Sequence, residues 1–326
     1  MNKNIKILIN YFLGPILFIV LSWSLYRQVI NQPHLSDNLA AIKNSWHNWK
    51  FWLVIFLMVI NWGIEARKWQ LLINHIQHFS FLKAFKSVLS GSSVTMLTPN
   101  RVGEYGGRIL YVDDGNRIKA ISLTIVGSIS QLLVTLIIGC GGLFFLRFFS
   151  GSDSNALNVL PELWSNILIY LSVGITFIVL LFYLRLSWLV RITEKIPALQ
   201  KIVKHILVLD EFSNMQLLHI LFLSFIRYLV FVLQYVLLLQ VMQVGLENWL
   251  CFWLISVFYL VMAIAPTFGF IELPVRAKAS WELLKFYSAN GLGIGAAALG
   301  IWFINLVIPA IFGSLLILSI KIVKEK

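Results

Sequence analysis

The sequence predicts an all-α integral membrane protein that crosses the bilayer about six times and carries two re-entrant helical hairpins arranged as inverted repeats. Hydrophobic residues make up 59% of the 326 residues and charged residues only 12%, against about 25% charge in soluble domains. Long uncharged stretches recur along the chain, and two short segments, 97–108 and 265–276, interrupt this pattern with Pro, Gly, Glu and Arg. These three observations together predict the fold class.

Six stretches are expected to be full spans, because about 18–20 apolar residues form a helix that crosses the hydrocarbon. The shortest has three nearby tryptophans that can anchor its start at the membrane surface. The first is too long for the core of a signal peptide and precedes no small-residue cleavage site, so we expect a retained anchor. The expected spans are 7–26, 51–64, 120–146, 163–184, 212–246 and 286–320.

The distribution of positive charge predicts the orientation. Lys and Arg gather at 3–6, 67–86, 117–119, 185–204 and 321–326, and the remaining loops hold few. Cytoplasmic loops of membrane proteins carry such an excess of Lys and Arg. We therefore expect both termini on the cytoplasmic side.

Two further apolar stretches are predicted to enter the membrane and return. Residues 87–100 begin and end near cytoplasmic charge, and residues 248–271 are followed by Pro274. Broken helices are tolerated at membrane depth only where their backbone faces protein or a wet cavity. We therefore expect the two dips to point at each other across a cavity near the midplane. In the alternative, 248–271 is an ordinary crossing and 286–320 must hold a hairpin.

This order divides one transmembrane domain, 1–326, into two repeats. Residues 51–146 form a span, a dip and a span, residues 163–184 connect, and residues 212–320 repeat the arrangement upside down. Inverted repeats whose broken helices meet near the midplane are typical of alternating-access transporters.

A set of six charged residues is predicted to lie at membrane depth. Each unpaired charge there costs about 2.5–3.5 kcal/mol, so six would cost roughly 15–20 kcal/mol without compensation. Two glutamates offset only two of the four arginines, and the guanidinium fork matches phosphate oxygens. We therefore predict that the following residues bind an anionic headgroup: Arg101, Glu104, Arg108, Arg227, Glu272 and Arg276.

Two simpler interpretations stay open for these charges. Glu104 with Arg108, and Glu272 with Arg276, are four residues apart, so each can form a local ion pair on an interfacial helix. Arg227 can extend its long side chain to the headgroup layer.

Helix-breaking residues accompany the charges in both segments, because Pro removes a backbone donor and Gly tolerates unusual backbone angles. We predict that they act as helix breaks or hinges. They are Pro99, Gly103, Gly106, Gly107, Pro266 and Gly269.

Other classes of site find no support in the sequence. Cys140 and Cys251 lie far apart in apolar stretches, which indicates neither a disulfide framework nor a thiolate metal site. No catalytic, metal-ligand or nucleotide-binding pattern emerges, so no cofactor or metal is expected. The net charge of +12 follows from membrane orientation and does not indicate nucleic-acid binding.

Residues 97–108 (LTPNRVGEYGGR) resemble the first signature of the lysylphosphatidylglycerol synthase transmembrane, or flippase-like, family, and 266–272 resemble its second. The resemblance extends over about residues 10–320. It implies a polytopic fold with re-entrant helices in a prokaryotic plasma membrane. It also implies movement of a modified lipid between leaflets in members that carry a synthase domain. Pro99, Arg101, Gly103, Glu104 and Arg108 match the first motif, and Pro266, Gly269 and Glu272 match the second.

The leading hypothesis is a flippase-like transporter for an anionic lipid, either a phospholipid or a polyprenyl-phosphate carrier. The chain has no room for a soluble aminoacyltransferase domain, since its longest polar loop has only about thirty residues and domains start at about 50. The alternative is a membrane-embedded transferase, or a subunit that presents lipid to a separate lipid-modifying or glycosyltransferase enzyme. A third interpretation is a scaffold that docks another membrane protein.

Overall fold

The structure, a computed structural model, describes residues 43, 45–96, 98, 102–149, 162–185, 188, 191, 207–264, 272–288 and 290–318, with the backbone alone at 272–274. Every regular element in these ranges is a helix. This confirms the predicted all-α class of a polytopic membrane protein.

Five helices are long and apolar enough to cross a membrane. They are α4 (Trp49–Ile73), α7 (Arg117–Phe148), α8 (Glu162–Leu184), α11 (Asn214–Val241) and the continuous Gly291–Leu318. They correspond to five of the six predicted spans, and the remaining one, 7–26, lies outside the described residues. Because 291–318 is one continuous helix, the alternative hairpin within 286–320 is wrong.

Helix α4 is longer than the predicted span 51–64. It continues through Glu65 and Lys68 to Ile73, and both charged side chains are buried. The prediction ended the span at the first charge, but a charge that is paired inside a helix bundle does not end a helix.

The last span consists of α14 (Gly291–Trp302), a π-helical turn η8 (Phe303–Val307) and α15 (Ile308–Leu318). Pro309 follows the turn at position i+4 from Asn305 and has no backbone N–H to donate to the carbonyl of that residue. The wider π turn accommodates this missing hydrogen bond.

Each half of the chain also contains a pair of short helices. In the first half these are α5 (Phe81–Thr95) and α6 (Gly103–Ile109), and in the second α12 (Asn248–Ile264) and α13 (Glu272–Leu284). With 15 and 17 residues, α5 and α12 are shorter than the ~20 residues of a full span. They overlap the predicted dips 87–100 and 248–271. Their re-entrant course stays a prediction, because the connecting residues 99–101 and 265–271 are not described.

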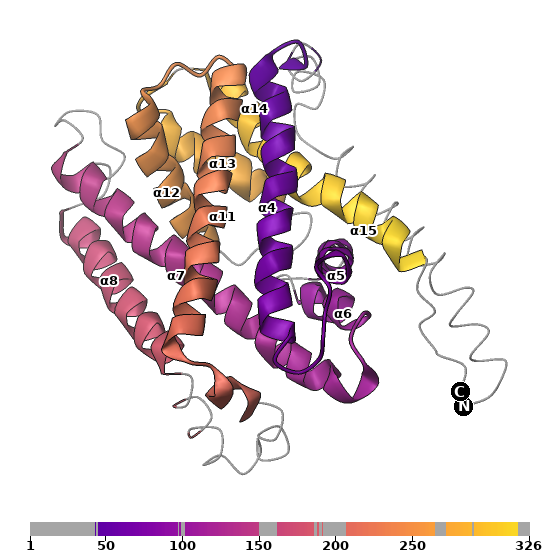
Figure 1. The fold of residues 1–326 in the computed structure, drawn as a ribbon. Helices are drawn as coiled ribbons and strands as arrows, with labels where there is room; N and C mark the ends of the chain where they lie inside the picture. The colour runs from indigo at the N-terminus through magenta and orange to yellow at the C-terminus, as the bar shows by residue number, and fades with distance from the viewer. Residues whose placement is uncertain are drawn as a thin grey trace.

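The helix contacts follow a reciprocal pattern (Figure 1). Helix α4 packs against α11, α7 packs against α12, and α15 packs against α5. In chain order, α4, α5, α6 and α7 correspond to α11, α12, α13 and the span that contains α14 and α15. Under this correspondence the α4–α11 contact maps onto itself, and the α7–α12 and α15–α5 contacts map onto each other. A two-fold relation between halves would produce this pattern. The repeats at 51–146 and 212–320 and their inverted orientation stay predictions.

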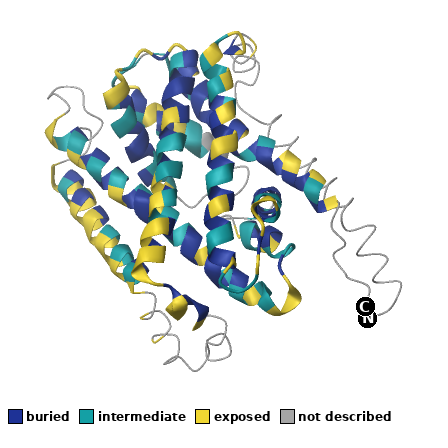
Figure 2. Ribbon diagram, in the orientation of Figure 1, coloured by how far each residue is buried: buried dark blue, intermediate teal, exposed yellow. Residues whose placement is uncertain are grey.

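Burial distinguishes the bundle interior from its periphery (Figure 2). Helix α8 packs on α7 but exposes large apolar side chains such as Tyr170, Phe177 and Ile178. An apolar exposed helix of 23 residues is suited to contact with lipid chains. Helices α4, α7 and α11 instead bury polar and charged residues, which places the candidate site among them.

Candidate functional site

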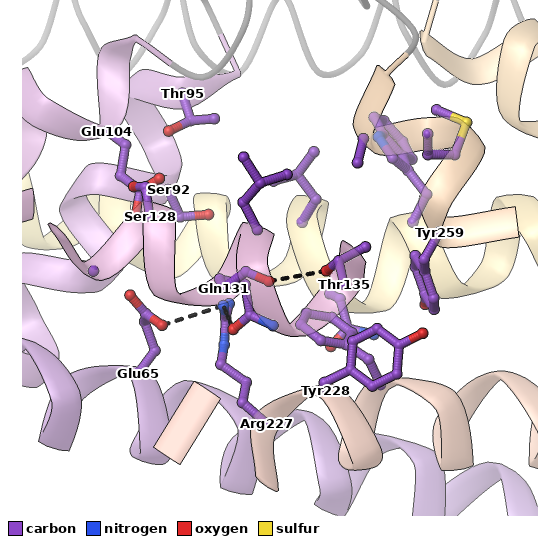
Figure 3. Close-up of a pocket in the computed structure, with 18 of the residues that line it drawn as sticks. Glu65, Ser92, Thr95, Glu104, Ser128, Gln131, Thr135, Arg227, Tyr228 and Tyr259 are labelled. Carbon is purple, nitrogen blue, oxygen red and sulfur yellow. Dashed lines mark hydrogen bonds and ion pairs between the residues drawn. The ribbon is translucent and has the colours of Figure 1, made fainter. Parts of the chain in front are cut away.

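A cavity of about 610 Å³ opens between the two halves of the bundle. Its lining comes from α4, α5, α6 and α7 on one side and from α11, α12, α13, α14 and η8 on the other. Figure 3 shows Arg227 extending from α11 toward Glu65 and Gln131, with Ser92 and Glu104 on the same side of the cavity as Glu65. Residues of both predicted repeats thus contribute to one site.

Glu65 is the centre of a buried ion-pair network. Its carboxylate lies 2.8 Å from Lys68 Nζ, 2.6 Å from Arg108 Nη2 and 3.2 Å from Arg227 Nη1. Only 5% of the Glu65 side chain is exposed. One carboxylate therefore serves three cations from α4, α6 and α11, a geometry that holds these helices together.

Arg227 is held on several sides at the cavity wall. Its Nε donates to Asn61 Oδ1 at 2.9 Å and its Nη1 donates to Gln131 Oε1 at 3.2 Å. The guanidinium also lies over the rings of Trp62 and Phe231, 5.7 and 5.0 Å from their centres, where the ring faces attract a cation. Only 12% of the Arg227 side chain is exposed, so the alternative in which it extends to the headgroup layer is wrong.

Arg108 lies directly behind the cavity wall. It pairs with Glu104 four residues earlier, as expected, and also with Glu65 on another helix. Its guanidinium carbon lies 5.2 Å from the centre of the Trp69 ring. With 2% of the side chain exposed, Arg108 does not serve to solubilise a helix end.

Lys68 joins the network to α7 and α11. Its ammonium donates to the carbonyl of Gly127 at 3.2 Å and to Ser224 Oγ at 3.4 Å, and Ser224 is 2.8 Å from Ser130. The ammonium thus has hydrogen-bond partners on three helices, as a buried charge requires.

Positive charge exceeds negative charge among the described residues of this site. Its cations are Lys68, Arg108, Arg227 and Arg276, and its carboxylates are Glu65 and Glu104. Guanidinium groups at a cavity wall can form paired hydrogen bonds with the oxygens of an anion. The arrangement can therefore bind an anion.

The predicted binding residues are distributed unevenly around the site. Glu104, Arg227 and Arg276 line the cavity, and Arg108 contacts two residues that do. Arg101 lies outside the described residues, and Glu272 begins α13 without a described side chain.

Lys68 is expected within the cytoplasmic charge group 67–86, but the structure buries it at the site. Glu65 is not among the predicted binding residues, because it lies close to Arg67 and resembles part of a charged loop. The sequence does hold a signal for a shared helix face, which is the three-residue spacing of Glu65 and Lys68 together with the flanking Trp62 and Trp69. That spacing places all four on one face of a helix. Arg67, by contrast, is exposed and bonds only within α4, to Gln70, in the contacts described here.

The glycines predicted as hinges differ in their surroundings. A Cβ added at Gly103 would lie 2.3 Å from the Val94 carbonyl oxygen, and one at Gly107 would lie 2.4 Å from that of Ser90. Nothing lies within 4 Å of a Cβ added at Gly106. Gly103 and Gly107 thus let α5 and α6 touch backbone to backbone. The predicted breaks at Pro99, Pro266 and Gly269 lie outside the described residues.

Comparison with known families matches residues 11–313 to the lysylphosphatidylglycerol synthase TM region. The chain belongs to this family. The match covers most of the chain and confirms the resemblance seen in the two motifs. Together with the apolar spans, family membership identifies a multi-pass membrane protein related to membrane lipids. No curated protein matches the chain.

Proposed function

We propose that the protein is a flippase-like transporter that moves an anionic lipid, a phospholipid or a polyprenyl-phosphate-linked lipid, between the leaflets of a prokaryotic plasma membrane. The observation that carries the proposal is the cavity whose wall and backing hold four cations and two carboxylates among the described side chains. Guanidinium groups bind phosphate through paired hydrogen bonds, and a low-polarity surrounding strengthens them.

Glu65 acts as the internal counter-ion in the absence of lipid. It holds Lys68, Arg108 and Arg227 within 3.2 Å, so the cations are positioned before the headgroup arrives. An entering phosphate shares Arg227 and Arg276 with the resident carboxylates. Positioning of this kind lowers the ordering cost of binding.

The two halves of the bundle provide the moving parts. The reciprocal contacts of α7 with α12 and of α15 with α5 support a two-fold relation, and the cavity lies between the halves. Rocking one half against the other around a fixed site exposes that site alternately to each leaflet. The expected topology has both termini in the cytoplasm, and the expected partners are the lipid itself and a separate lipid-modifying enzyme.

Reconstitution into liposomes tests this function. A fluorescent anionic phospholipid becomes accessible to an added quencher when it reaches the outer leaflet, so the rate of translocation can be measured. Arg227→Gln and Arg276→Gln are expected to slow translocation by about 10- to 100-fold each, from the ~1.5–3 kcal/mol of a charged hydrogen bond. Arg67→Gln is the control, because Arg67 is exposed on the same helix as Glu65 and does not line the cavity.

Equal translocation by all four proteins would contradict the proposal. Chemical modification of the lipid by the purified chain would instead favour the transferase alternative, and mass spectrometry of the recovered lipid detects it.

A further inference from the structure

The cavity has a second group of polar atoms besides its charges. Trp62 Nε1, Ser92 Oγ, Trp302 Nε1 and Asn305 Oδ1 are buried and have no hydrogen-bond partner among the residues that the structure describes. All four residues line the cavity, and they are between 3% and 8% exposed. Buried polar atoms in folded proteins are almost always paired with protein, water or a ligand, and an unpaired one costs about 1–3 kcal/mol. The four atoms around this cavity are therefore available to pair with a ligand that enters it.

The types of these atoms restrict the chemistry of that ligand. An indole N–H can only donate, so Trp62 and Trp302 require acceptor oxygens. Asn305 donates its Nδ2 to the Ile301 carbonyl at 3.3 Å, which leaves Oδ1 pointing away as an acceptor. The ligand must therefore supply a donor as well. A fully ionised phosphate has no hydrogen to donate, whereas a hydroxyl group both donates and accepts.

The π-helical turn gives two of these atoms their position. Trp302 immediately precedes η8 and Asn305 lies within it, and both face the cavity. A π turn inside a long helix is often found at functional sites. Here Pro309 follows the turn, and Trp302 and Asn305 line the same cavity.

Aromatic rings form much of the remaining wall. They belong to Trp62, Tyr105, Tyr228, Phe231, Tyr259 and Trp302. Flat ring faces carry negative charge density and attract the weakly positive edges of a ligand lying against them. A cavity of about 610 Å³ falls in the ~300–1,000 Å³ range of sites for molecules much larger than a phosphate ion. The site therefore has room for a hydroxylated ring beside the phosphate.

We propose that the headgroup carries a sugar or another cyclic polyol joined to its phosphate. Arg227 and Arg276 bind the phosphate, while Trp62, Ser92, Trp302 and Asn305 bind the ring hydroxyls. This inference rests on the proposed function, since it takes the cavity as the headgroup site, and it defines the substrate class more narrowly.

Lipid binding to the purified full chain tests it without measuring transport. Native mass spectrometry in detergent gives the dissociation constants of phosphatidylinositol, phosphatidylglycerol and phosphatidic acid. These lipids present a cyclic polyol, a linear polyol and a bare phosphate. We expect phosphatidylinositol to bind at least about fivefold more tightly than either of the others, from the ~1 kcal/mol of a net hydrogen bond. Equal binding, or a preference for phosphatidic acid or phosphatidylglycerol, would overturn the proposal.

Three variants test whether the cavity residues cause the preference for phosphatidylinositol. Trp302→Phe removes one N–H and keeps an aromatic ring, and Asn305→Leu removes the acceptor at similar size. Each should weaken phosphatidylinositol binding by about fivefold, the ~1 kcal/mol of one hydrogen bond, and leave phosphatidic acid binding unchanged. Trp253→Phe is the matched control, because the Trp253 N–H is also buried without a partner but the residue packs against Phe145 outside the cavity. A loss of the same size in Trp253→Phe, or equal losses for both lipids in Trp302→Phe, would contradict the assignment.

The outcome is separable from that of the transport test. A chain that binds phosphatidylinositol selectively but does not translocate any lipid refutes the transporter and retains the headgroup class. A chain that translocates all three lipids equally, with equal binding, retains the transporter and refutes the headgroup class.

Discussion

Glu65 on α4 and Arg108 on α6 form an ion pair of 2.6 Å inside the bundle. The two residues are 43 positions apart in the chain, and the pair joins the first long helix to the short helix of the signature motif. Because Glu65 also pairs with Arg227 on α11, one carboxylate connects the motif to the second half of the protein. The stability of the site depends on this contact, and under the proposed function so does the positioning of its cations for an anion.

Glu65→Gln should strongly destabilise the protein. The variant leaves three neighbouring cations with reduced compensation, and removing one partner of a buried pair costs about 3–5 kcal/mol. The melting temperature in detergent measures this effect. Glu282→Gln is the control, since the pair of Glu282 with Lys285 lies at the surface, and its melting temperature should stay close to that of the wild type.

Gly107→Ala should separate α5 from α6. The new Cβ would lie 2.4 Å from the Ser90 carbonyl oxygen and 2.5 Å from the Gly91 Cα, and neither backbone atom can move easily. Gly106→Ala, with open space around it, should be neutral or stabilising by up to ~1 kcal/mol because Ala favours helix. Melting temperatures of the two variants measure the difference. Similar values would show that close packing does not explain Gly107.

Ser87→Ala tests a polar connection beneath the site. Ser87 Oγ accepts from Trp69 Nε1 at 3.0 Å and donates to the Arg108 carbonyl at 3.0 Å. The substitution leaves the buried indole N–H unpaired, which costs about 1–3 kcal/mol. In the double variant with Trp69→Phe, the two losses should be less than additive, because the same hydrogen bond is removed twice. Full additivity in unfolding measurements would contradict the connection.

Arg227→Lys separates charge from geometry in transport. Lysine keeps the positive charge but cannot reproduce the fork that reaches Asn61, Gln131 and Glu65. We expect its translocation rate to fall between those of the wild type and Arg227→Gln. A rate equal to that of the wild type would show that charge alone is sufficient.

The spans could be predicted from the sequence because long apolar stretches have a single physical explanation. Arg227 could be predicted at depth for the same reason, since no other charge lies in 212–246. Glu65 and Lys68 could not, because a charge near the end of an apolar stretch predicts a loop unless its partners are known. Those partners, Arg108 and Arg227, come from distant parts of the chain.

The role of the glycines likewise required coordinates. Both a hinge and a close contact between helices favour a residue without a side chain. The glycines at 103, 106 and 107 are therefore compatible with either one. The distances to the Val94 and Ser90 carbonyls show a close helix contact at Gly103 and Gly107, while the hinge stays a prediction. Trp302 precedes the π turn and Asn305 lies within it, and apolar periodicity does not indicate such a turn.

An experimental structure of the protein with bound anionic lipid tests the central claim most directly. We predict lipid phosphate density in the cavity, with an oxygen about 3 Å from a guanidinium nitrogen of Arg227 or Arg276. Lipid phosphates found only at the outer surface of the bundle, with the cavity holding no headgroup, would contradict it.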